Sequence, residues 1–151
     1  MFLYLMCIVF PNMKPEQEYK VKEFMKKDVV IVTPETSVRK AAEVMAAEHV
    51  SSAMVCKNKR LVGIITEKDL ARKIVAKGVD ADKALAKDIM TSELVTIEPE
   101  KSLYDAMLKL NKKKVTHLPV VRNNVLVGII SSMDILRVQP SYMEILAGPK
   151  I

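Results

Sequence analysis

The chain contains an internal repeat. A shift of 65 residues aligns its two halves without a gap. The positions that coincide include Met25 with Met90, Pro34 with Pro99, Ser37 with Ser102, residues 61–65 with residues 126–130, and Asp69 with Asp134. Self-similarity at a fixed period is typical of chains built from repeated structural units. Any fold proposed for this chain must therefore contain two copies of one unit.

Each copy predicts the order β-α-β-β-α. A short β-branched run ends at a proline, which cannot donate a hydrogen bond to a sheet. A serine then precedes apolar residues at helical spacing and is expected to cap that helix. Two apolar runs joined by an asparagine-containing turn predict a hairpin, and a second helix follows. The expected strands and helices are 29–32, a helix over at least 38–45, 53–56, 61–65 and 67–77 in the first copy, and 94–97, a helix over at least 103–110, 118–121, 125–130 and 132–138 in the second.

This order predicts an α+β (α/β-like) fold, in which the two repeats pack through their sheets about a pseudo-twofold axis. The predicted organisation is an N-terminal extension at 1–20, a first domain at 21–78, a linker at 79–86, a second domain at 87–138 and a C-terminal tail at 139–151.

Residues 1–10 carry no charge, but they are too few to span a bilayer, which needs about 20 residues. They also lack the basic start and cleavage site of a secretory signal. We expect an upstream start codon, with Met13 as the ordinary beginning. The alternative is an extra strand or an arm that covers a partner.

The composition argues against an enzyme. The chain has four glycines, and no P-loop or GxGxxG turn can be written around them. GxSxG and HExxH motifs do not occur either. Two cysteines and two histidines show no metal-ligand spacing. We therefore expect no catalytic residue, no metal and no cofactor.

A Gly-x-x-Thr/Ser-x-x-Asp motif occurs twice, where a strand meets a helix. The motif contributes Thr66 and Asp69 in one copy and Ser131 and Asp134 in the other. Free backbone N–H groups at a helix start favour an anion, and an aspartate there can accept hydrogen bonds from both hydroxyls of a ribose. The alternative interpretation is structural, because the same residues can form a capping box.

The opening and closing motifs of both copies resemble tandem cystathionine β-synthase (CBS) domains of the stand-alone type, over roughly residues 20 to 138. This resemblance implies a regulatory module that senses an adenosine-containing ligand such as AMP, ADP, ATP or S-adenosylmethionine. It identifies the two aspartates with the ribose-binding position. It also implies that a basic residue just before the Leu-Pro-Val strand, here His117, faces the phosphates, with Lys114 three residues earlier.

The first copy departs from that pattern. Ser52 stands where the second copy has His117, and His49 stands where it has Lys114. We therefore expect two clefts of unequal affinity for phosphorylated ligands. The predicted nucleotide-binding residues are Val32, Thr33, Thr66, Lys68, Asp69, Ile97, Lys114, His117, Pro119, Ser131, Ser132 and Asp134.

The expected partners are an adenosine-containing small molecule, a second copy of the chain in a homodimer, and a regulated protein of unknown identity. We expect a cytoplasmic protein without membrane contact. The formal charge of +6 leaves nucleic acid as the less favoured alternative. An interaction subunit whose clefts no longer bind ligand is the other alternative.

Overall fold

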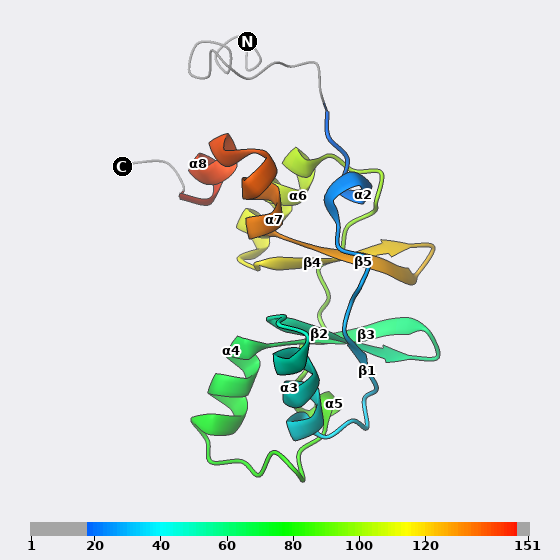
Figure 1. The fold of residues 1–151 in the computed structure, drawn as a ribbon, viewed down its shortest axis with the longest axis vertical. Helices are drawn as coiled ribbons and strands as arrows, with labels where there is room; N and C mark the ends of the chain where they lie inside the picture. The colour runs from blue at the N-terminus through cyan, green and yellow to red at the C-terminus, as the bar shows by residue number, and fades with distance from the viewer. Residues whose placement is uncertain (1–17, 148–151) are drawn as a thin grey trace.

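The computed structural model describes residues 18–147, so the expectations for residues 1–10 lie outside it. Each repeat forms a lobe in which a hairpin is covered by helices (Figure 1). The lower lobe contains β1 (Ile31–Val32), α3 (Val38–Ala47), β2 (Ser52–Lys57), β3 (Arg60–Thr66), and α4 (Glu67–Asp69) continuing as a π-helix at Leu70–Val75. The upper lobe contains α6 (Leu103–Lys113), β4 (His117–Arg122), β5 (Val125–Ser131), α7 (Ser132–Val138), a 3₁₀ turn at Pro140–Tyr142, and α8 (Met143–Ala147). The short helices α2 (Val21–Phe24) and α5 (Ala86–Ile89) complete the described chain.

The long helix of each lobe forms as its sequence predicts. Ser37 Oγ accepts a hydrogen bond from the backbone N–H of Lys40, and Ser102 Oγ accepts one from Asp105, so both helices have an N-cap. The apolar stripe of each helix is buried in the core of its lobe. The buried residues are Val38, Ala41 and Met45 in α3 and Leu103, Ala106, Met107 and Leu110 in α6.

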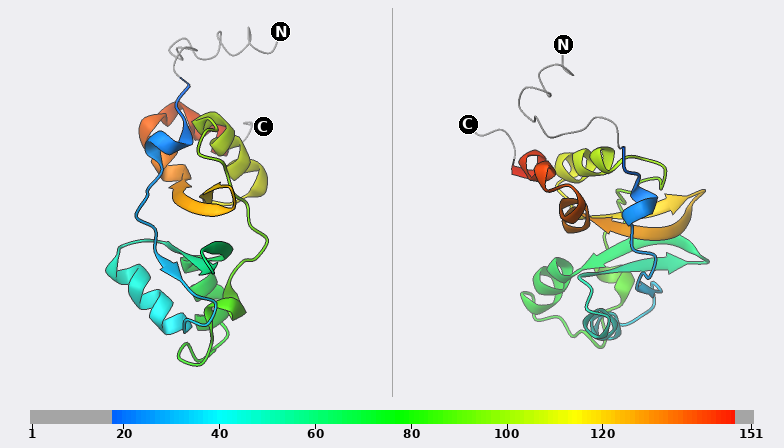
Figure 2. Two further views of the ribbon diagram at one scale, coloured as in Figure 1. Left: turned by 90° about the vertical axis from the view of Figure 1, so that its right-hand side faces the viewer. Right: turned by 45° about the horizontal axis from the view of Figure 1, so that its top comes forward.

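The two hairpins join into one five-stranded sheet of order β1-β2-β3-β5-β4. Strands β3 and β5 pair only at Arg60 and Val125, close to the hairpin turns. Both hairpins point the same way and lie face to face (Figure 2, right). The first strand of each repeat is shorter than predicted: β1 covers two residues, and Ile97 alone makes the corresponding bridge, to Val120.

The lobes exchange their short helices. Val21 of α2 is fully buried in the core of the upper lobe, whereas Ala86 and Ile89 of α5 belong to the core of the lower lobe. Figure 1 shows α2 beside α6 and α7, although the rest of its repeat forms the other lobe. The two connecting segments run along opposite sides of the molecule (Figure 2, left). Each lobe is therefore completed by a helix from the other repeat.

Each connecting segment crosses the second hairpin strand of the lobe that it leaves. Lys26 forms a backbone bridge to Ile129, and Thr91 forms the corresponding bridge to Ile64. Among residues 18–147, no helix combines the length and the apolar character needed to cross a membrane.

Candidate functional site

A cavity of about 480 Å³ lies where the two hairpins diverge. Both repeats line it. The first contributes Lys26, Asp28, Val29, Val30, His49 and Ser51, among others. The second contributes His117, Ile129, Ser131, Ser132, Asp134 and Arg137, among others. The volume falls in the range of small-molecule sites, about 300 to 1,000 Å³.

Asp134 supplies a carboxylate to the cavity wall. Its Oδ2 accepts hydrogen bonds from the backbone N–H and the hydroxyl of Ser131, at 2.9 and 2.6 Å, which makes the capping box of the alternative interpretation. Its Oδ1 lies 3.2 Å from Lys26 Nζ, and its side chain is only 10% exposed. Burial by itself raises the pKa of Asp134, but the hydrogen bonds from Ser131 and Lys26 outweigh it. The pKa of this carboxyl therefore lies below its ordinary value, and the group is an anion at neutral pH.

His117 joins the two repeats at the edge of the cavity. Its Nε2 lies 3.0 Å from Ser51 Oγ, and its Nδ1 lies 2.9 Å from Thr116 Oγ1. Burial lowers the pKa of His117 below its ordinary value, and the carboxylate of Asp134 only partly offsets this effect. The ring is therefore neutral at pH 7 and can offer one donor and one acceptor.

Asp69 has the same local geometry in the first repeat. Its Oδ2 accepts hydrogen bonds from the backbone N–H and the hydroxyl of Thr66, at 2.8 and 3.0 Å. Its counter-ion differs, because Lys73 comes from the same helical segment and lies 2.8 Å from Oδ1. Lys73 Nζ also donates to the backbone carbonyl of Ile89 at 2.6 Å. The repeats thus share the capping box but neutralise the two aspartates with different lysines.

Comparison with known proteins agrees with this architecture. The model of the CBS domain family matches residues 21–76 and 86–141, which together make up more than half of the chain. The chain belongs to the CBS domain family. Because the match occurs twice, it forms a CBS domain pair, which is a regulatory module.

Its relatives include proteins of archaea and bacteria. A Methanopyrus kandleri protein, MK0525, is 33% identical over 80% of this chain, and the chain spans 62% of that protein's length. The CBS domain-containing protein YhcV of Bacillus subtilis is 32% identical over 76% of this chain and 81% of YhcV. Among solved structures, the CBS domain pair of MJ0100, in complex with 5′-methylthioadenosine and S-adenosyl-L-methionine, is 26% identical. It superimposes with a TM-score of 0.76 and covers 83% of this chain and 98% of the MJ0100 pair.

The cavity of the CBS pair brings together part of the predicted site. His117, Ser131, Ser132 and Asp134 all line it. Thr66, Lys68 and Asp69 occupy the equivalent strand-to-helix junction of the first repeat and do not line this cavity. Ser52, the counterpart of His117, does line it.

The other predicted residues lie elsewhere. Val32 and Ile97 are buried in the cores of the lobes. Pro119 is also buried, but its neighbours Leu118 and Val120 face the core, so Pro119 lies on the opposite face of the sheet. Thr33 bonds to the side chain of Thr36, outside the cavity. Lys114 ends α6 in the left-handed conformation and is not among the lining residues. Val29 and Val30, which precede the predicted residues 32–33, do line the cavity.

Several residues that line the cavity belong to no sequence motif that could have predicted them. Lys26 sits on the connecting segment, and its counterpart in the repeat is Thr91, so the alignment of the two copies could not single it out. Arg137 does have a counterpart, Arg72, one helical turn after the motif aspartate. This identity was the available signal for a basic residue on the cavity wall.

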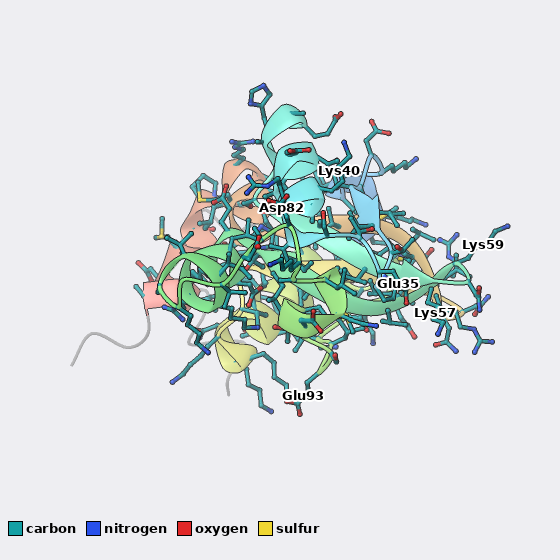
Figure 3. All side chains as sticks on the ribbon, turned by 90° about the horizontal axis from the view of Figure 1, so that it is seen from below. Glu35, Lys40, Lys57, Lys59, Asp82 and Glu93 are labelled. Atoms are coloured by element: carbon teal, nitrogen blue, oxygen red, sulfur yellow. The ribbon has the colours of Figure 1, made fainter. Side chains whose placement is uncertain are left out.

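Basic charge is also present away from the cavity. Lys57 and Lys59 project outward at the turn of the β2–β3 hairpin (Figure 3). Neither of these lysines lines the cavity, so the net charge of the chain does not measure the charge of the site. Across residues 18–147, no group of three or more histidine, cysteine or acidic side chains could hold a metal ion.

Proposed function

We propose that this CBS pair is a sensor that binds an adenosine-containing small molecule in the cavity between its two repeats. The observation that carries the proposal is the position of Asp134. Its carboxylate is anchored by Ser131, lies on the wall of a 480 Å³ cavity, and still has acceptor capacity on Oδ1. A carboxylate held in this way suits the two hydroxyls of a ribose.

The rest of the cavity has the chemistry that such a ligand requires. Val29, Val30 and Ile129 offer apolar surface to a flat base. Lys26, His49 and Arg137 offer nitrogen donors to a polar or anionic 5′ substituent. The MJ0100 pair, which is bound to two adenosine compounds, supports the same class of ligand for this chain. AMP, ADP, ATP and S-adenosylmethionine are the candidates.

A cavity shared by two repeats also provides a regulatory mechanism. A ligand that contacts both lobes stabilises one relative placement of them, and a protein bound to the pair would respond to that placement. We propose a protein partner regulated in this way and a cytoplasmic location.

We further propose that the pair forms a homodimer through helices of both repeats. Exposed apolar side chains support this, with Val75 on the π-helix of the first repeat 77% exposed and Met133 on α7 of the second repeat 57% exposed. Light scattering on the purified chain tests the assembly, and a monomer at tens of micromolar would contradict it.

The function itself is tested by calorimetry with adenosine, AMP, ATP, S-adenosylmethionine and a short RNA. We expect Asp134→Asn to abolish binding of the adenosine compounds. Asp69→Asn is the matched control, because it removes the same capping carboxylate without touching the cavity. A ligand at 100 times its Kd adds about 2.7 kcal/mol to the free energy of unfolding, so thermal melting provides a second readout. Equal loss of binding in both variants, or RNA binding that Asp134→Asn leaves unchanged, would contradict the proposal.

A further inference from the structure

The ammonium group of Lys26 forms an ion pair with the carboxylate of Asp134 in the cavity. Its Nζ lies 3.2 Å from Asp134 Oδ1, the oxygen that the capping box leaves open. The Asp134 side chain is 10% exposed, whereas that of Lys26 is 59% exposed. A carboxylate this buried requires a counter-ion, because removing an unpaired charge from water is costly. Lys26 provides that counter-ion in the ligand-free protein.

The backbone of Lys26 is fixed while its side chain is not. Lys26 N–H donates to the carbonyl of Ile129 at 2.8 Å, and Ile129 N–H donates to the carbonyl of Lys26 at 2.9 Å. Within residues 18–147, Asp134 is the only ion-pair partner of its ammonium. The long side chain can therefore move within the cavity without disturbing the segment that connects the lobes.

We infer that Lys26 exchanges partners when a ligand binds, and that this exchange makes the site prefer an anionic over a cationic 5′ substituent. The inference rests on the proposed function. Ribose hydroxyls that donate to Asp134 take the place of the ammonium, which then pairs with the 5′ group of the same ligand. A phosphate forms an ion pair with the Lys26 ammonium, whereas the sulfonium and ammonium groups of S-adenosylmethionine repel it.

The other charged groups of the cavity do not decide this preference. Arg137 favours an anion, and Asp28 opposes it. Lys26 differs from them because it contacts the carboxylate assigned to the ribose. The corresponding position of the other repeat carries Thr91, which is uncharged, so the exchange belongs to the Asp134 cavity alone.

The test compares Lys26→Met with the wild type by calorimetry, using adenosine, AMP, 5′-methylthioadenosine and S-adenosylmethionine. We expect AMP to bind roughly tenfold to a hundredfold more weakly, because one charge-assisted hydrogen bond is lost. Adenosine and 5′-methylthioadenosine should bind at least as tightly as before, since nothing competes for Asp134. S-adenosylmethionine should bind more tightly, because a like charge has been removed.

Two further variants keep the result interpretable. Lys26→Arg retains the positive charge and should retain the preference for AMP. Lys27→Met removes a neighbouring exposed lysine that does not line the cavity, and it should behave as the wild type. A loss in Lys26→Met that is equal for adenosine and AMP, or no change for either, would overturn the inference while leaving the proposed function intact. Failure of all four ligands to bind the wild type would overturn both.

Discussion

Ser51 Oγ and His117 Nε2 lie 3.0 Å apart, and this hydrogen bond connects the residue before β2 to the first residue of β4. It is a contact between the two repeats at the edge of the cavity. Because burial lowers the pKa of His117, the folded protein holds this ring in its neutral form. Protonation of the ring and stability of the lobe arrangement are therefore linked.

This link predicts a pH dependence. The folded pKa of His117 lies below the unfolded value, which is about 6.5, so below that pH the unfolded chain binds more protons. The contribution is fully present above about pH 6.5 and decreases as the pH falls through the folded pKa. Urea unfolding at pH 7.5 and 5.5 should show a smaller loss of unfolding free energy in His117→Gln than in the wild type. A loss in His117→Gln as large as that in the wild type would contradict the link.

The connecting segments cross the hairpins close to Gly63 and Gly128. A Cβ added at Gly128 would lie 2.8 Å from the backbone carbonyl oxygen of Lys26, whereas one added at Gly63 would meet only the side chain of Met90. A side chain can move more easily than a backbone bridge. We expect Gly128→Ala to lower the free energy of unfolding by about 1 to 3 kcal/mol and Gly63→Ala to lower it less.

A double-mutant cycle checks the reason for that difference. Met90→Ala removes Sδ and Cγ, the two atoms nearest to a Cβ at position 63, and keeps only the Cβ at 3.0 Å, so the cost of Gly63→Ala should largely disappear in the double variant. If the two costs are simply additive, the contact between Met90 and Gly63 is not the cause.

Because α2 of the first repeat packs in the upper lobe, a substitution in α2 should destabilise the upper lobe more than the lower one. Val21 is fully buried against the core that contains Leu103 and Leu118. Val21→Ala should lower the unfolding free energy by about 2 kcal/mol, and amide exchange should speed up in α6 and β4 more than in α3 and β2. Val79→Ala, at an exposed position, should have little effect. Faster amide exchange confined to α3 and β2 would contradict the packing of α2 in the upper lobe.

The parts of this structure that local sequence determines were predictable. Both long helices, both hairpins and the capping boxes at Asp69 and Asp134 depend on residues within a few positions of one another. Turn geometry followed in the same way, since Asn58 and Asn123 adopt the positive φ that hairpin turns favour.

Features that depend on distant packing were not predictable in this way. Helices α2 and α5 have four residues each, too few for a periodic pattern, and their burial is decided by the opposite lobe. The ion pair between Lys26 and Asp134 depends on how the connecting segment crosses β5. The π-helix at Leu70–Val75 carries the same apolar spacing as an α-helix, so the sequence predicted a continuous helix there.

The two lysines that neutralise the aspartates predict unequal binding. Lys73 is held at both Asp69 Oδ1 and the carbonyl of Ile89, whereas Lys26 is held by Asp134 alone among the described residues. A ribose must break two interactions to displace Lys73 and one to displace Lys26. We therefore expect calorimetry with adenosine to show one tight site per chain, at Asp134.

Lys73→Met should expose the Asp69 carboxylate and raise the stoichiometry toward two. Lys77→Met, which removes an exposed lysine one turn further along the chain, should leave it at one. A stoichiometry of two in the wild type, or of one in Lys73→Met with its fold intact by circular dichroism, would show that Lys73 does not control this site.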